Sequence, residues 1–154
     1  MTIAIPKMQE PQKSDIARLE EVLGGKLPIE YLDFIRIHDG ATPEHNSIAI
    51  GSANESNVTR FISAADAATV VTGVEGFPAT VIPLGEDGCG NFFYMDRAVG
   101  SVHFWDHEIE GEDALVAPSL VKFLEALAPF DSSTVKLAPG DVTHAWIDPS
   151  FKPE

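Results

Sequence analysis

The segment from Thr80 to Glu108 constrains the fold more than any other part of the chain. It contains three short runs of aromatic and β-branched residues, at 81–84, 91–95 and 101–105, separated by turns rich in glycine and acidic residues. Runs bounded in this way are typical of strands joined into hairpins. We therefore expect three consecutive strands in this segment.

Apolar residues recur at helical spacing in four other segments, at 14–23, 28–38, 64–71 and 114–128. Ser14 and Ser63 stand where N-caps are expected, and Pro28 stands at the first position of the second helix. On that helix the apolar face is expected to consist of Ile29, Leu32 and Ile35, flanked by Tyr31 and Phe34.

Two further short strands are expected at 47–51 and 58–62, on either side of a polar loop at 53–57. Helices that each carry one apolar face are expected to pack on the sheet. The residues expected to be buried are Val81, Ile82, Leu84, Phe92, Tyr94, Val102 and Phe104 in the sheet, and Leu32, Ile35, Phe123 and Leu127 on the helices.

The length of 154 residues suits one domain with its own core. The single cysteine, Cys89, excludes an internal disulfide and a CxxC metal pair. Residues 1–15 lack the basic and apolar stretches of a secretion signal, and no apolar run approaches the roughly 18 residues of a membrane span. We therefore expect a cytoplasmic protein that does not bind a membrane.

Negative charge is concentrated after residue 40. Residues 1–40 hold 7 acidic and 5 basic side chains, whereas residues 41–154 hold 17 and 5, within a net charge of −14. Such a surface repels nucleic acid and attracts basic partners, and the same charge also keeps a protein soluble. The residues expected to face a basic partner are Asp106, His107, Glu108, Glu110, Glu112 and Asp113, with Glu86 and Asp87 near them.

The segment 130–154 differs in character from the rest of the chain. Three prolines interrupt it, yet it carries several apolar residues, more than a disordered tail usually does. We expect a strap that lays Trp146 and Phe151 on the domain surface, with an oligomer contact as the alternative.

The residues give little support to catalysis. His103 and His107 have the i, i+4 spacing of zinc ligands on a helix, but on a strand four residues span about 13 Å, too far to share one metal. Cys89 has no histidine in its sequence context to act as its base. We therefore expect no catalytic residue, no metal and no cofactor.

The Gly85–Asn91 turn could suggest a ligand loop. It lacks the Lys-Ser/Thr ending of a phosphate loop, and its spacing does not match the EF-hand pattern. A calcium site would draw its oxygens from Glu86, Asp87, Asn91 and Asp96. We favour instead a tight hairpin in which Gly88 and Gly90 supply positive φ angles.

Two motifs, in a fixed order, are shared with a known family. The first is an LP turn, an aromatic residue, a Phe and a helix-ending Asp-Gly, in Leu27-Pro28-Ile29-Glu30-Tyr31-Leu32-Asp33-Phe34-Ile35 and Asp39-Gly40. The second comprises Ile82-Pro83-Leu84-Gly85, Asp87-Gly88, Gly90-Asn91, Asp96, Gly100, Val102 and Trp105-Asp106-His107-Glu108. With a closing helix at 119–127, the chain resembles the SUKH superfamily in its Smi/Knr-type branch. The resemblance covers about 14–129 and leaves 130–154 outside.

This resemblance implies an α+β fold with a central, largely antiparallel sheet flanked by helices, in one domain over 1–154. Many bacterial members look like immunity proteins that bind and neutralise a cognate toxin, often a nuclease, and fungal relatives act as regulatory interaction proteins. We therefore expect a non-catalytic protein-binding module, with an immunity protein as the first hypothesis. A housekeeping regulator or adaptor is the second. An enzyme or metal-binding protein that uses the Gly85–Asn91 loop is the third, and it predicts polar groups converging on a pocket beside that loop.

Overall fold

The structure is a computed structural model that describes residues 4–52, 54–111, 113–130, 138–140, 143–144, 146 and 149–150. Its elements in chain order are α1 (Lys13–Leu23), α2 (Ile29–His38), β1 (Ser47–Ile50), β2 (Asn54–Asn57), β3 (Arg60–Phe61), α3 (Ala64–Gly73), β4 (Ile82–Glu86), β5 (Phe92–Met95), β6 (Val102–Trp105), β7 (Ala114–Ala117) and α4 (Leu120–Ala126).

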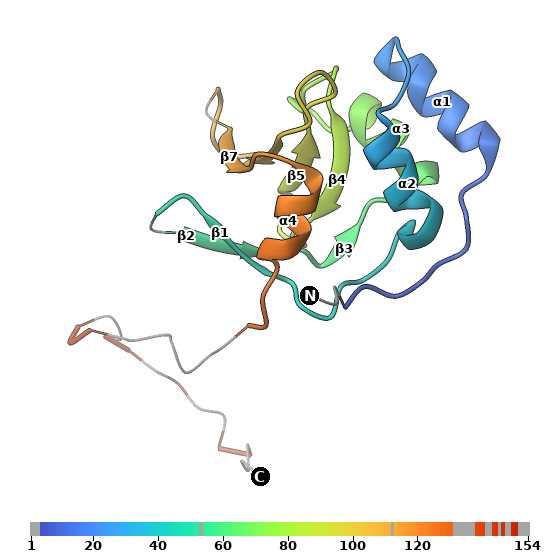
Figure 1. The fold of residues 1–154 in the computed structure, drawn as a ribbon. Helices are drawn as coiled ribbons and strands as arrows, with labels where there is room; N and C mark the ends of the chain where they lie inside the picture. Colours follow the sequence, from blue (N-terminus) through green and yellow to red (C-terminus); the bar gives the residue numbers. More distant parts are fainter. Residues whose placement is uncertain are drawn as a thin grey trace.

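Strands β3 to β7 form a five-stranded sheet in chain order, and every neighbouring pair is antiparallel. Strands β1 and β2 form a separate two-stranded sheet. In Figure 1, α4 lies in front of the main sheet and α1 to α3 gather on the side of β4. The expected α+β fold with an antiparallel sheet flanked by helices is confirmed.

Helix α1 ends where the sequence predicts but begins earlier. Gly24 adopts a left-handed conformation with φ of 72°, and its N–H donates to the carbonyl of Glu21 at 3.2 Å. At the other end Gln12, and not Ser14, precedes the first helical residue. The Gln12 carbonyl accepts N–H groups from the first turn, so Ser14 lies inside the helix and caps nothing.

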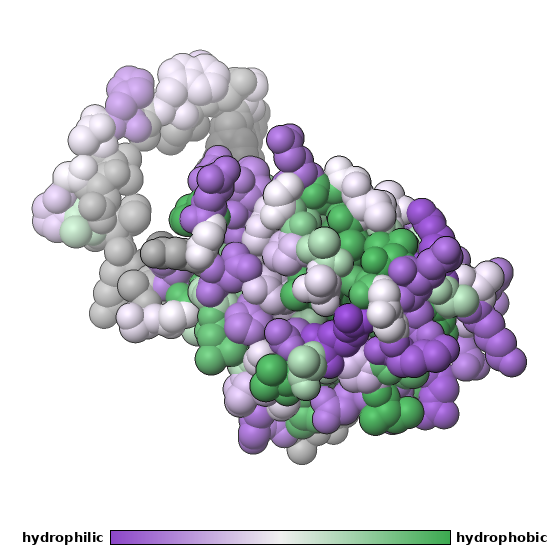
Figure 2. Space-filling model, turned by 90° about the horizontal axis from the view of Figure 1, so that it is seen from above, coloured by the Kyte–Doolittle hydropathy of each residue, from purple (hydrophilic) through white to green (hydrophobic). Residues whose placement is uncertain are grey.

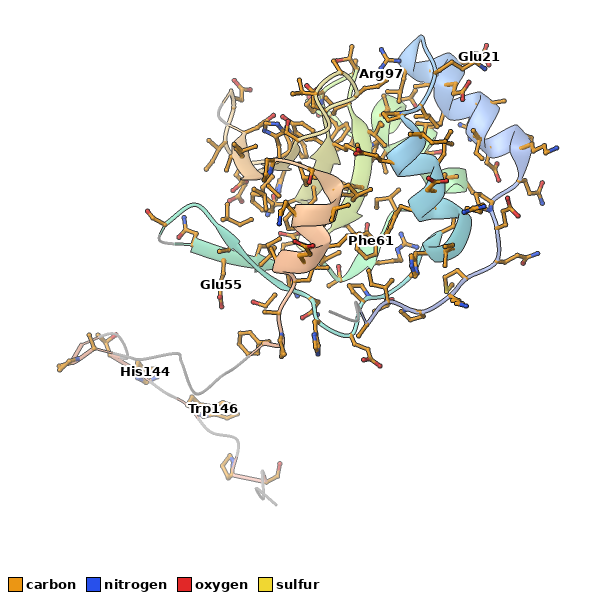
Figure 3. The ribbon with its side chains drawn as sticks, in the orientation of Figure 1. Glu21, Glu55, Phe61, Arg97, His144 and Trp146 are labelled. Atoms are coloured by element: carbon orange, nitrogen blue, oxygen red, sulfur yellow. The ribbon has the colours of Figure 1, made fainter. Side chains whose placement is uncertain are left out.

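Helix α2 presents a different face from the one expected. Tyr31, Phe34 and Ile35 are buried, whereas Ile29 is 69 % exposed and Leu32 is partly buried. Pro28 flanks the helix and is not its first residue. The bulky aromatic side chains turn inward because Phe34 packs against Phe61 of β3, with ring centroids 4.9 Å apart; Figure 3 shows Phe61 between β3 and α2.

The start of α3 agrees with the prediction. The Ser63 hydroxyl accepts the N–H of Asp66 at 3.2 Å, which caps the helix. A second acceptor comes from the end of α2, where Asp39 Oδ1 accepts the N–H of Ala64 at 2.7 Å. The helix-ending Asp-Gly therefore ties α2 to α3.

Two segments differ from their predicted structure. Residues 54–57, expected as a loop, form β2 and pair with β1 from Ser47↔Asn57 to Ile50↔Asn54. Residues 114–117, expected at the start of the last helix, form β7 on the edge of the main sheet. Pro118 disfavours helical backbone in the residue before it, so α4 begins only after Ser119, whose Oγ accepts the N–H of Lys122 at 3.2 Å.

Strand β5 is buried on both faces. On one face Phe93 meets Phe123 of α4, with ring centroids 5.4 Å apart, and on the other Phe92 meets Phe77 at 5.7 Å. The residues confirmed as buried are Val81, Ile82, Leu84, Phe92, Tyr94, Val102, Ile35, Phe123 and Leu127; Leu32 and Phe104 are partly buried. β5 thus forms the centre of one core that extends to all the helices.

The outer surface carries both hydrophilic and hydrophobic side chains. The strap expected at 130–154 stays a prediction. In Figure 2 hydrophilic side chains surround several patches of hydrophobic ones. Trp146 is 73 % exposed and lies apart from the sheet in Figure 3, and Phe151 lies outside the described residues. Within the described ranges no helix is long and apolar enough to cross a bilayer.

Candidate functional site

The turn between β4 and β5 is organised by Asp87. This residue is 7 % exposed, and its Oδ1 accepts the N–H groups of Cys89, at 2.8 Å, and of Asn91, at 3.1 Å. Gly88 and Gly90 have φ angles of 80° and 90°, as the hairpin prediction requires. The Asp87 carboxylate therefore shapes the turn and is not displayed to a partner.

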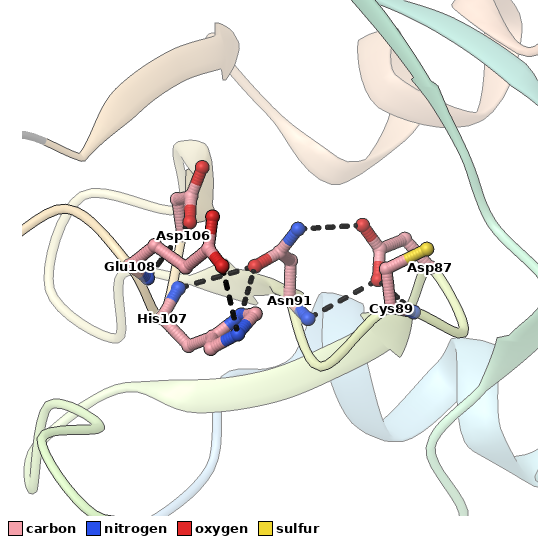
Figure 4. Close-up of polar contacts among 6 residues, drawn as sticks. All are labelled: Asp87, Cys89, Asn91, Asp106, His107 and Glu108. Carbon is pink, nitrogen blue, oxygen red and sulfur yellow. Dashed lines mark hydrogen bonds and ion pairs between the residues drawn. The ribbon is translucent and has the colours of Figure 1, made fainter.

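Asn91 joins this turn to the one that follows β6. Its Nδ2 donates to Asp87 Oδ2 at 2.9 Å, so its Oδ1 faces His107 and accepts from the backbone N–H, at 3.1 Å, and from ring Nδ1, at 2.7 Å. The chain Asp87–Asn91–His107 is seen in Figure 4. Gly90 lies under the imidazole, since a Cβ there would be 3.2 Å from His107 Nδ1. The two turns that the sequence places near each other do meet.

The turn after β6 projects carboxylates outward. Asp106 Oδ1 accepts the N–H of Glu108 at 2.9 Å, and the Asp106 carbonyl accepts the N–H of Ile109 at 3.2 Å. The Glu108 side chain is 80 % exposed, with Oε1 4.0 Å from His107 Nε2. Glu110 and Ile109 are also exposed. This tight turn, residues 106–110, is called the acidic turn below.

Not every predicted partner residue lies on this surface. Asp87 is buried, and Glu86 is held in an ion pair by Arg60 Nε at 3.2 Å. Asp113 accepts the hydroxyl of Tyr94 at 2.6 Å. Burial and this carboxylate raise the pKa of Tyr94 well above its ordinary value. Glu112 lies outside the described residues, so its place stays a prediction. Of the described residues predicted to face a partner, Asp106, His107, Glu108 and Glu110 lie together on the acidic turn.

A hollow of about 670 Å³ adjoins the acidic turn. Its lining residues are Val74, Glu75, Gly76, Gly90, Trp105, Asp106, His107, Ile109, Glu110 and Gly111. Sequence reasoning missed it because residues 74–76 follow α3, far from the 105–111 segment in the chain. Carboxylates and one imidazole converge here beside the Gly85–Asn91 loop, which is the feature that the enzyme hypothesis predicts.

The described side chains do not assemble a metal or calcium centre around this loop. No group of three or more His, Cys, Asp or Glu among the described residues is placed to hold an ion. Asn91 precedes β5 and Asp96 follows it, so the two residues lie at opposite ends of the strand. Asp96 Oδ1 accepts the N–H groups of Ala98 and Val99. The oxygens proposed for calcium therefore do not converge.

The two histidines considered as zinc ligands serve separate contacts. Whereas His107 binds Asn91, His103 stacks on Tyr94, with ring centroids 5.1 Å apart, and its Nε2 lies 2.9 Å from Ser101 Oγ. Sequence reasoning did not identify this Ser–His contact, in which Ser101 directly precedes β6 and His103 lies on it. Neither Ser101 nor His103 lines the hollow.

Comparison with known families accounts for the two motifs. The family model described as SMI1 / KNR4 family (SUKH-1) matches residues 10–126. The chain belongs to this family. The SUKH-1 match runs from just before α1 to the last residue of α4 and includes both turns of the site. The 130–154 segment lies beyond it, and no curated protein matches the chain.

Proposed function

We propose that this SUKH-1 protein is a non-catalytic immunity protein that binds and neutralises a cognate bacterial toxin in the cytoplasm. The observation that supports this most is the acidic turn, which Asn91 anchors from below while Glu108 and Glu110 point outward. A rigid, negatively charged surface loses little conformational freedom on binding and attracts a basic protein quickly. A toxin that is a nuclease binds polyanions and therefore tends to carry a basic surface.

The same reasoning argues against nucleic acid as the partner. The net charge of −14 would oppose association with a phosphate backbone. Family membership also supports the regulator or adaptor hypothesis, in which the partner is not a toxin. The hollow is the one observation that favours an enzyme, and it brings together carboxylates and His107 without a serine or cysteine nucleophile among its lining residues.

The decisive experiment concerns the neighbouring gene. If a large secreted protein with a small C-terminal toxic domain is encoded next to this chain, that domain is expressed with and without the SUKH-1 protein. We expect growth to be rescued and a one-to-one complex to form, with the toxin inactive in it. A chain that neither binds nor protects against its neighbour would contradict the immunity function and favour the regulator.

A further inference from the structure

The hollow beside the acidic turn is lined by both apolar and charged residues. The apolar ones are the buried Trp105, Val74 and the half-exposed Ile109. Carboxylates of Glu75, Asp106 and Glu110 lie around it, and no lysine or arginine is among the lining residues. Among the described residues Glu75 and Glu110 have no ion-pair partner.

The walls of this hollow are held in place independently of any partner. The Trp105 ring packs against Phe77, with centroids 5.4 Å apart, and against Phe92 at 6.1 Å. Gly76 has a φ angle of 78°, a backbone conformation that favours glycine, and it places the loop after α3 beside the indole. On the other side the His107 ring is fixed by Asn91 at 2.7 Å. The hollow is therefore preformed.

An arginine side chain suits such a hollow better than other groups. Its aliphatic stem would pack on Ile109 and Val74, and its planar guanidinium would donate to carboxylates on both sides of the hollow. A buried arginine in a preformed pocket is also a common energetic anchor of protein interfaces.

We infer that this hollow is the anchor site of the partner interface and accepts an arginine side chain from a basic protein partner. The inference rests on the proposed function for the identity of the partner, but its chemistry is testable without one. The inferred centre of the interface is then the space between the acidic turn and Glu75, and not the acidic turn alone.

The test uses the chain of 154 residues and compares arginine with citrulline, its neutral isostere. Trp146→Phe leaves Trp105 as the only tryptophan, because the chain has two. The tripeptides acetyl-Gly-Arg-Gly-amide and acetyl-Gly-citrulline-Gly-amide are titrated at physiological salt while NMR follows the Trp105 indole and the amides of Gly76 and Gly111. We expect the arginine peptide to shift these signals and the citrulline peptide to leave them unchanged.

Two double variants separate the hollow from general attraction to an acidic protein. Glu75→Gln with Glu110→Gln should weaken arginine-peptide binding roughly three- to tenfold. Glu21→Gln with Glu55→Gln removes the same charge from α1 and β2, outside the hollow's lining, and should leave binding unchanged (Figure 3). Equal weakening by both pairs, or shifts spread over the whole acidic surface, would overturn the inference.

The toxin experiment then distinguishes the two proposals. A toxin that is neutralised equally by wild type and by the Glu75/Glu110 variant would refute the anchor site and leave the immunity function standing. A neighbouring gene product that is never bound, together with specific arginine-peptide binding, would refute the immunity function and leave the site standing.

Discussion

Asn91 and His107 are sixteen residues apart, yet one oxygen, Asn91 Oδ1, accepts both the backbone N–H and the ring Nδ1–H of His107. The other end of the same amide donates to the buried carboxylate of Asp87. The Asn91 side chain thus fixes the β4–β5 turn and the acidic turn relative to each other. Both turns belong to the candidate interface.

We expect Asn91→Ala to lower the free energy of unfolding by about 1–3 kcal/mol, because it removes the Nδ2 donor from the buried Asp87 carboxylate and leaves the His107 N–H without its acceptor. Urea denaturation measures the loss, and amide exchange should become faster at His107. Asn57→Ala, at an exposed position of β2, is the control and should change stability by less than about 0.5 kcal/mol. Equal effects of the two substitutions would show that the Asn91 contacts do not stabilise the fold.

Gly25 and Arg97 are expected to be energetically coupled. A Cβ on Gly25 would lie 2.8 Å from Arg97 Nη1, a buried atom with no hydrogen-bond partner among the described residues, and Figure 3 shows Arg97 near the end of α1. Gly25→Ala should therefore displace the Arg97 guanidinium and destabilise the wild type by about 0.5–1.5 kcal/mol, because the contacted atom ends a flexible side chain. In an Arg97→Ala background it should instead stabilise by about 0.4–1 kcal/mol, because alanine restricts the unfolded chain.

Gly24 provides the matched control for this double-mutant cycle. Its φ is 72° and a Cβ at this position would have no atom within 4 Å, so Gly24→Ala is strained by its backbone alone. Its cost of about 1–2 kcal/mol should be the same with Arg97 or Ala at position 97. A Gly25→Ala effect that is likewise independent of residue 97 would contradict the steric argument.

Asp39 should make stability depend on pH. Burial raises its pKa above the ordinary value of 3.8, while the N–H of Ala64 acts in the opposite direction. The pKa of Asp39 is higher in the folded state than in the unfolded state. The carboxyl therefore does not reduce the free energy of unfolding below its unfolded-state pKa, and it reduces that free energy as pH rises through its folded-state pKa. Asp39→Asn keeps an acceptor for Ala64 without this loss, so its melting temperature relative to wild type should increase between pH 3 and pH 7. A relative decrease over that range would mean that the fold favours the charged carboxylate.

Charge reversal on the acidic turn should slow binding. Glu108→Lys with Glu110→Lys is expected to lower the association rate with the toxin and to weaken its salt dependence, while the fold stays intact because both side chains are solvated. Each exposed pair contributes only about 0.2–1 kcal/mol, so the double variant is needed. The association rate constants of wild type and variant are measured at two salt concentrations. An unchanged association rate would place the interface on another face.

Metal ions should not change stability. A metal bound only by the native state at 100 times its dissociation constant would add about 2.7 kcal/mol. We expect the same melting temperature with calcium, magnesium, zinc or EDTA, because both Asp87 oxygens already accept hydrogen bonds within the turn. A metal-dependent rise that disappears in Asp87→Asn would support the metal-binding hypothesis instead.

Features that depend on neighbouring residues were predictable from the sequence. The three central strands lie within two residues of the predicted runs, because aromatic and β-branched residues favour strands wherever turns flank them. Gly88 and Gly90 have the expected positive φ angles, since side chains disfavour that backbone conformation. Ser63 caps α3 as predicted, because its contact reaches only three residues along the chain.

Features that depend on distant residues were decided by the tertiary structure. The polar 54–57 segment forms a strand because its backbone pairs with β1. The aromatic face of α2 is buried because Phe34 packs against Phe61. Residue type alone placed Asp87 among the displayed acids, whereas packing buried it under its own turn. The sequence by itself thus determined the three central strands, the cap of α3 and the excess of negative charge. Only the folded chain decided which carboxylates are used internally and which remain around the hollow, because that choice depends on contacts between segments far apart in the sequence.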